Sequence, residues 1–237
     1  DNDIVVSTLF QKLRPDVFGS EGEAFAPLKA LDVTVGGTAN FRISMTGGLK
    51  YASFDLSSGA GKVTLPHPHL KNIDVKSITA TGHVDVDLER LVVKNLVVDL
   101  DGPTIAVNGS ASRSADHTDF KAGLVIDGLP VNDFSRYWPP DMASGAREWI
   151  TENIQGGIFT NGRAELSGRI ETVGGAFSLA TFGATAKINK TKVHFFRPMP
   201  PVIDTDMKAV FGKDRIDIQV EHGELKGITI SEGSVTI

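Results

Sequence analysis

The sequence lacks cysteine altogether, has no long hydrophobic run, and carries only two tryptophans and two tyrosines among its 237 residues. Without cysteine, a disulfide framework and a thiolate metal site are both excluded. No run approaches the roughly 18 apolar residues that a membrane-spanning helix requires, and no secretory signal peptide is evident. A net charge of −5 argues against a nucleic-acid-binding protein, because such a protein needs a basic face to displace counterions from the phosphates.

What the sequence does contain is an amphipathic strand pattern along most of its length. In one segment, for example, Ile216, Ile218 and Val220 alternate with polar residues at a period of two. Short gaps, many with glycine, separate the segments, which predicts hairpins and therefore mostly antiparallel pairing. The predicted strands cover well over a third of the chain and lie at 4–10, 31–35, 41–46, 51–57, 62–65, 75–88, 91–100, 105–113, 120–127, 158–170, 177–196, 205–211, 215–221, 225–231 and 234–237.

One stretch between the strands has the period of a helix instead. Its apolar residues recur at i, i+3, i+4 and i+8, and they are Ala146, Trp149, Ile150 and Ile154. Asp141 or Ser144 can cap the start, and Gly156-Gly157 ends the pattern. We therefore predict a mainly β protein with one short amphipathic helix at about 143–154. The segment 13–29 should be irregular, because prolines and glycines interrupt it.

Two histidine-containing groups have the composition of a metal site, and each also has a simpler structural interpretation. His67 and His69 flank a proline with no acidic third ligand nearby, which favours a solvated turn. His83, Asp85 and Asp87 share one strand face and have the composition of a cation site. The polar alternation of a solvent-facing strand is the simpler explanation of them, so we predict no metal and no cofactor.

A pair of carboxylates raises the question of catalysis. Asp204 and Asp206 follow two prolines and have the composition of a glycoside-hydrolysing pair, although a position beside a loop also explains them. No phosphate-binding loop, serine-hydrolase elbow or zinc-protease motif is present. The sequence therefore predicts that the protein is not an enzyme and has no catalytic residue.

The apolar faces of the strands must be buried by something, and two arrangements satisfy that need. Period-two alternation by itself favours a sandwich, or a sheet closed upon itself, with side chains filling the interior. The alternative is an open, curved sheet whose apolar concave face holds acyl chains. Small residues on the apolar positions favour the alternative because they leave room, and they are Gly162, Ala164, Ala184 and Ala186.

Two motifs in the second half of the chain carry a family resemblance. The first consists of Leu129-Pro130, Tyr137-Trp138-Pro139, Ala146, Trp149, Ile154 and Gly156-Gly157. The second consists of Phe196, Pro198, Pro200-Pro201, Asp204, Asp206, Phe211, Ile216, Ile218, Gly223, Leu225 and Gly227. In these positions the chain resembles the AsmA-like superfamily of bacterial envelope proteins, in particular its long YhdP and TamB groups.

The resemblance implies a fold and a place in the cell. The expected fold is a long, curved, mostly antiparallel sheet that forms an open groove, with β strands at 1–128, a helix-containing insertion at 129–157, and further strands at 158–237. These parts would form one continuous architecture within a longer protein. The expected location is the periplasm, with an anchor in the inner membrane outside this sequence.

The implied function is a segment of a bridge that binds phospholipid acyl chains and supports lipid transport between the inner and outer membranes. A second hypothesis is an envelope scaffold, or an assembly factor for outer-membrane proteins, that acts through its sheet edges. A carbohydrate enzyme ranks last. The expected partners are phospholipid, the inner membrane and outer-membrane components, with no nucleic acid.

Specific residues follow from these expectations, although the alternation does not say which face is concave. The predicted groove lining is Val84, Val86, Leu88, Ile158, Ala164, Leu166, Phe182, Ala184, Ile188, Ile216, Ile218 and Val220. The residues predicted to pack the helix against the sheet are Trp138, Trp149, Ile150 and Ile154.

Overall fold

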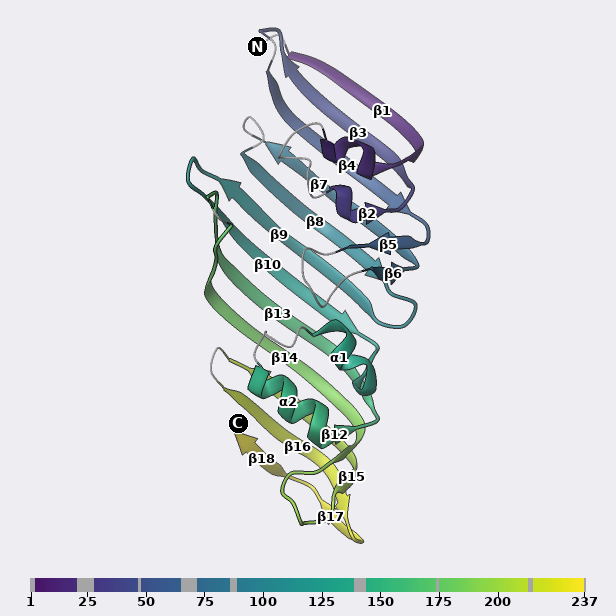
Figure 1. The fold of residues 1–237 in the computed structure, drawn as a ribbon, viewed down its shortest axis with the longest axis vertical. Helices are drawn as coiled ribbons and strands as arrows, with labels where there is room; N and C mark the ends of the chain where they lie inside the picture. The colour runs from purple at the N-terminus through teal and green to yellow at the C-terminus, as the bar shows by residue number, and fades with distance from the viewer. Residues whose placement is uncertain are drawn as a thin grey trace. The chain divides into compact units, whose positions relative to one another are not determined.

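The computed structural model describes residues 3–20, 28–46, 48–64, 72–85, 89–138, 144–173, 175–212 and 215–236. Strands account for 68% of the described residues, and most belong to one open antiparallel sheet (Figure 1). The strand order of that sheet is β1-β3-β4-β7-β8-β9-β10-β13-β14-β15-β16-β17, with β11 on β13, β12 on β14 and β18 on β16. The predicted mainly β, antiparallel fold is confirmed.

The first ten strands overlap the predicted segments, although residues 31–35 and residues 75–88, each predicted as one strand, are each divided between two strands. They are β1 (Asp3–Leu13), β2 (Leu31–Asp32), β3 (Val35–Ser44), β4 (Leu49–Ser58), β5 (Gly61–Val63), β6 (Ile73–Val75), β7 (Ser77–Asp85), β8 (Arg90–Asp99), β9 (Thr104–Arg113) and β10 (His117–Asp127). Of these, β2, β5 and β6 form a separate three-stranded sheet. A 3-10 helix, η1 (Pro15–Ser20), occupies part of the segment that we expected to be irregular.

The second half of the chain adds the helices and the longest strands. Its elements are β11 (Leu129–Pro130), η3 (Val131–Asp133), α1 (Phe134–Tyr137), α2 (Ser144–Asn153), β12 (Ile154–Gln155), β13 (Ile158–Glu171), β14 (Phe177–Val193), β15 (Val202–Phe211), β16 (Ile216–Leu225), β17 (Ile228–Ile230) and β18 (Gly233–Thr236).

The helix α2 lies where the period of 3.6 predicts it, although residues 139–143 lie outside the described part of the chain. Its last carbonyls have partners: the Arg197 guanidinium donates to the backbone oxygen of Glu152 at 3.3 Å, and the backbone N–H of His194 donates to that of Asn153 at 2.8 Å. Such bonds satisfy the acceptors that a helix end leaves unpaired.

The expectation of a single helix was wrong, because α1 precedes α2. Four residues are too few to produce a recognisable apolar period. Trp138 ends α1 with extended backbone angles, φ −108° and ψ 112°. The next residue is Pro139, and a residue before proline is disfavoured in the helical region.

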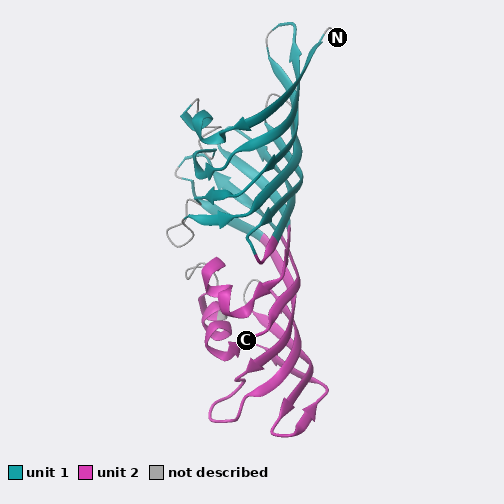
Figure 2. Cartoon of the chain, turned by 90° about the vertical axis from the view of Figure 1, so that its right-hand side faces the viewer, with its two compact units in different colours: residues 1–101, 105–123, 166–180 teal, residues 102–104, 124–165, 181–237 magenta. Residues whose placement is uncertain are grey.

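Two compact units divide the chain (Figure 2). Unit 1 consists of residues 1–101, 105–123 and 166–180, and unit 2 of residues 102–104, 124–165 and 181–237. The strands β10, β13 and β14 contribute residues to both units. Compactness therefore divides the chain differently from the three consecutive parts expected from the sequence.

Unit 2 has a closed hydrophobic core. Cross-strand partners bring apolar residues into rows, such as Ala186 beside Ala209 and Ala209 beside Ile218. The segment containing α1 and α2 lies over these strands (Figure 1). The most deeply buried apolar residues of the core include Ile150, Ile154, Ile188, Val193, Met207 and Ile218.

Single left-handed residues interrupt three neighbouring strands of unit 2. They are Asn161 in β13, Lys190 in β14 and Asp204 in β15, with φ of 51°, 57° and 48°. The backbone N–H of Asn161 donates to the Asp127 carboxylate at 3.0 Å, and that of Lys190 donates to the Asp206 carboxylate at 3.0 Å. The side-chain oxygens thus replace partners that the backbone N–H groups have in a regular ladder.

These interruptions change which face a side chain occupies. We expected Ile158 to share a face with Ala164, but Ile158 is 47% exposed and its neighbour Phe159 is 4% exposed. Asn161 is an extra residue in the strand between Ile158 and Ala164. The side-chain alternation therefore shifts by one position at Asn161. The expected orientation of Ile158 was therefore wrong.

Candidate functional site

The largest apolar feature of unit 1 is one face of strands β3, β4, β7 and β8. Partners in an antiparallel pair point to the same side of the sheet, so the strand register identifies the residues of each face. One row runs through Leu56, Ala80 and Leu96. The unit 1 apolar face comprises Ala39, Phe41, Ala52, Phe54, Leu56, Ile78, Ala80, Val84, Leu91, Val93, Leu96 and Val98.

The opposite face of the same strands is mostly polar. The row that alternates with Leu56, Ala80 and Leu96 consists of Asp55, Thr81 and Asn95. Only β8 is apolar on both sides, where Val92 and Val97 take outer positions. The sheet of unit 1 is therefore amphipathic, as a sheet with one buried face would be.

The unit 1 apolar face is nevertheless not buried in the described structure. Its members are half-buried, with Leu91 reaching 38% exposure, and none belongs to the buried core. Among the described residues of unit 1, the buried hydrophobic side chains include Val33, Val35, Val75 and Leu100. Twelve apolar side chains thus form a contiguous half-exposed surface, which is larger than the isolated exposed residues typical of soluble domains.

Few side chains project far from the unit 1 apolar face. The Phe54 ring lies across Gly82 of the next strand, where an added Cβ would come within 2.6 Å of the ring. Alanines at 39, 52 and 80 keep the neighbouring rows low. The predicted lining residue Val84 belongs to this face, whereas Val86 and Leu88 lie outside the described residues.

Unit 2 contains an apolar cavity of about 290 Å³ between α1 and the sheet. Four small residues of β13 and β14 line it, namely Gly162, Ala164, Ala184 and Ala186. Aromatic residues form much of the remaining wall: Phe134, Tyr137, Trp138, Phe159, Phe182 and Phe211. Three predicted lining residues, Ala164, Phe182 and Ala184, therefore meet at one cavity.

The other predicted lining residues of unit 2 lie elsewhere. Ile188, Ile216, Ile218 and Val220 are between 1% and 6% exposed and belong to the closed core, where no ligand has access. Of the predicted helix-packing residues, Ile150 and Ile154 are buried, and Trp138 and Trp149 pack partly buried against the same core. Leu166, which belongs to unit 1, is half-buried.

Sequence reasoning missed Phe134, Phe159 and Phe211 as parts of the cavity wall. Phe134 lies in the short helix that the pattern did not reveal, and Phe159 was assigned to the wrong face. Phe211 does stand in the second family motif, which was the one available signal. The rings of Phe134 and Phe159 stack at 4.7 Å between centroids.

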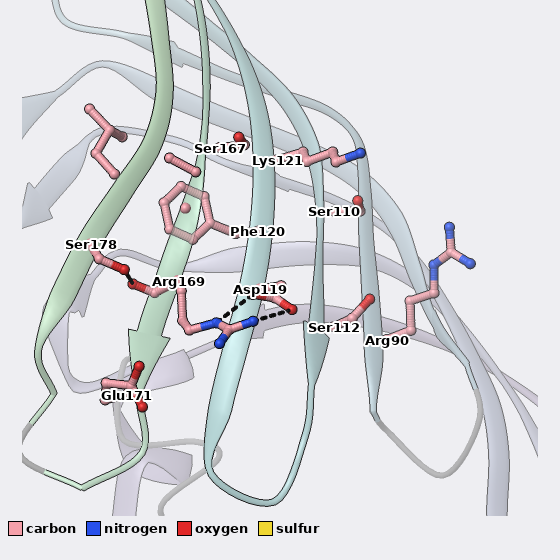
Figure 3. Close-up of a pocket in the computed structure, with 13 residues that line it drawn as sticks. Arg90, Ser110, Ser112, Asp119, Phe120, Lys121, Ser167, Arg169, Glu171 and Ser178 are labelled. Carbon is pink, nitrogen blue, oxygen red and sulfur yellow. Dashed lines mark hydrogen bonds and ion pairs between the residues drawn. The ribbon is translucent and has the colours of Figure 1, made fainter. Parts of the chain in front are cut away.

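A polar hollow of about 830 Å³ lies in unit 1 (Figure 3). Its side chains include three cations, Arg90, Lys121 and Arg169, and two carboxylates, Asp119 and Glu171. Arg169 donates to both oxygens of Asp119, at 2.9 and 3.4 Å, as the dashed lines in Figure 3 show.

Ion pairing shifts the pKa values of the charged groups in this hollow. The Arg169 guanidinium lowers the pKa of the Asp119 carboxyl, and Asp119 in turn raises the pKa of Arg169. His117 bonds to both Asp119 and Asp116, and its contact lowers the pKa of the Asp116 carboxyl. A general acid of glycoside hydrolysis needs a raised pKa, so Asp119 has the opposite property.

The candidate metal and carboxylate groups are only partly paired where they are described, since His83 Nδ1 and Asp85 Oδ1 are buried without a hydrogen-bond partner. His83 Nε2 lies 3.8 Å from an Asp85 oxygen, and its ring stacks on Tyr51 at 5.5 Å. Asp206 accepts the Lys190 backbone N–H. No group of three or more potential metal ligands occurs among the described residues, and His67, His69 and Asp87 lie outside them.

None of the helices in the described part of the chain has the length and hydropathy needed to cross a bilayer. Comparisons with curated proteins and with solved structures returned no match. A family model described as "YhdP protein" matches residues 30–237, which includes all of unit 2, unit 1 from residue 30 onward, and both sequence motifs. Because that match covers most of the chain, the protein belongs to the YhdP family, the group of AsmA-like envelope proteins that its motifs resemble.

Proposed function

We propose that this chain is a non-enzymatic segment of a periplasmic bridge, which binds phospholipid acyl chains and supports lipid movement between the inner and outer membranes. The observation that carries the proposal is the unit 1 apolar face, whose twelve side chains are aligned in register and left half-exposed. A soluble protein has little reason to keep such a surface unless an apolar ligand covers it.

The binding free energies expected on this face favour movement of a lipid along it over tight binding at one position. Burial of an acyl chain contributes about 0.8 kcal/mol per methylene. Because adjacent rows present similar side chains, a chain that slides by one row exchanges one apolar contact for another of nearly equal free energy. The lipid head group stays in water, since the burial of an unpaired charge is costly.

A second candidate function has one observation in its favour. The edge strand β1 exposes Val5 at 67% and Leu9 at 74%. Residues 4–11 of this strand carry no charge, and an edge strand with an uncharged, largely apolar stretch can pair with a strand from another protein. The scaffold hypothesis therefore assigns function to this edge, whereas the lipid hypothesis assigns it to the unit 1 apolar face.

Site-specific photocrosslinking in cells separates the two hypotheses. A photoreactive residue at Leu56 or Leu96 should capture phospholipid, and one at Asp55 or Asn95 should not, because these neighbours point to the opposite face. Equal capture from both faces, or none from either in a folded protein, would refute the lipid hypothesis. Loss of bound outer-membrane proteins in Val5→Lys and Leu9→Lys variants would instead support the scaffold.

A further inference from the structure

We propose that the unit 2 cavity is a separate binding site for a single linear hydrocarbon chain, such as one acyl tail. The proposal depends on the proposed function only for the source of that chain. It concerns residues that do not belong to the unit 1 apolar face, so either site can exist without the other.

The cavity exists because small residues coincide in neighbouring strands. Ala184 lies beside Phe211 of β15, and Ala186 lies beside Ala209. One row further, Ile188 and Met207 are 1% exposed and fill the space beneath the helices completely. The change from isoleucine to alanine along β14 therefore leaves the space that α1 roofs over.

Contacts of Trp138 prevent α1 from moving into this space. The Trp138 ring meets Phe134 at 4.6 Å and Phe211 at 6.3 Å between centroids, both with the rings at 66°. The Arg147 Nε of α2 donates to the Trp138 backbone oxygen at 2.9 Å. The aromatic contacts of Trp138 and the hydrogen bond from α2 hold the cavity wall in place, so the cavity does not collapse.

The lining defines the class of ligand. Nearly all the lining side chains are hydrocarbon or aromatic, so an apolar ligand that covers them removes apolar surface from water. A sugar or a free head group would find few hydrogen-bond partners there. With about 290 Å³, the cavity is just smaller than the roughly 300–1,000 Å³ that ligand sites typically occupy. That size suits part of one chain and excludes two chains side by side.

The two tryptophans of the sequence provide a direct test, because only Trp138 lines the cavity. Trp149 packs instead against Phe195, at 6.4 Å between centroids. The purified chain with Trp149→Phe retains Trp138 as its single tryptophan, and the chain with Trp138→Phe retains Trp149, so selective excitation of tryptophan reports one position in each. Each is titrated with a fatty acid brominated in mid-chain, a contact quencher of tryptophan, and with the unbrominated acid.

Saturable quenching of Trp138 by the brominated acid, with little quenching of Trp149, is the expected result. Equal quenching of both tryptophans, or no quenching of Trp138 while circular dichroism shows an intact fold, would overturn the proposal. Lipid capture at Leu56 and Leu96 does not enter this readout, so failure here leaves the unit 1 hypothesis standing.

Filling the cavity provides the second measurement. In the Trp149→Phe background, Ala184→Leu should weaken the apparent affinity for the brominated acid at least tenfold. Ala164→Leu does the same from β13 and replaces Ala184→Leu if that variant fails to fold. The matched control is Ala60→Leu, at an exposed position between β4 and β5 outside the unit 1 apolar face, which should leave Trp138 quenching unchanged. Unaltered quenching in a folded, cavity-filled variant would refute the assignment.

Discussion

Units 1 and 2 both contain an antiparallel sheet with one apolar face, but that face is covered in unit 2 and left partly exposed in unit 1. In unit 2 the segment with α1 and α2 covers the face, and Ile188 and Ile218 are each 1% exposed. In unit 1 the corresponding rows, such as Leu56, Ala80 and Leu96, are left half-buried. Strand alternation is equally clear in both, so alternation reveals an apolar face but not whether the protein covers it.

The strongest test of this difference places the same charge in both units. Ile218→Asp should cost about 4 kcal/mol or more and abolish cooperative folding of unit 2, because the carboxylate would be buried without a partner. Leu96→Asp should cost only about 1–2 kcal/mol, since water reaches its position. Urea denaturation of the two variants measures the difference. Equal losses would mean that the unit 1 apolar face is as closed as the unit 2 core.

A second test removes part of the cover. Ile150→Ala should lower the free energy of unfolding by about 3 kcal/mol, because Ile150 is 2% exposed and its truncation leaves a void. Thr151→Ala, at the exposed next position of α2, should change it by less than about 0.5 kcal/mol. Chemical denaturation followed by circular dichroism gives both values. A small effect of Ile150→Ala would show that α2 covers the sheet only loosely.

A third test loosens the roof of the cavity without removing it. Arg147→Ala deletes the bond from Nε to the Trp138 backbone oxygen and should cost about 1.5 kcal/mol. The emission of Trp138 in the Trp149→Phe background should shift to longer wavelength as water gains access. Glu148→Ala, on the exposed side of the same helix, is the control and should leave the emission unchanged.

The smallest expected effect concerns the polar hollow of unit 1. Arg169 lowers the pKa of Asp119 in the folded state, so this pair stabilises the fold above the unfolded aspartate pKa of about 3.9. The stabilisation is lost as the pH falls through the lower, folded pKa. Asp119→Asn should therefore slightly reduce the urea midpoint at pH 7, and the difference from the unaltered chain should vanish at low pH. A difference that persists or grows with acidification would contradict this origin.

Much of the fold could be predicted from the sequence because it depends on local periodicity. The strands, their antiparallel pairing and the helix α2 follow from residues within a few positions of one another. The family membership also came from local motifs, such as Trp138 and Trp149 at their spacing from Gly156. These features require no knowledge of what lies across the sheet.

The candidate site was harder to predict because it depends on packing between distant segments. Nothing in the alternation of β16 says that Ile216 and Ile218 lie in a closed core, while Leu56 and Leu96 lie on an open face. Such differences arise only when the segment of α1 and α2 covers some strands and leaves others. The small residues Ala164 and Ala184 did indicate a space, since a missing side-chain volume is visible in the sequence itself.

The left-handed residues Asn161, Lys190 and Asp204 have a consequence for how this sheet can change in length. In a regular strand, loss of one residue turns every later side chain to the wrong side. Where an extra residue is already accommodated, with Asp127 and Asp206 accepting the displaced N–H groups, one residue can be gained or lost with the disturbance confined to that point. Insertions and deletions among relatives should therefore occur mainly at these three positions. There a strand can change in length by one residue while the side-chain alternation on either side is kept.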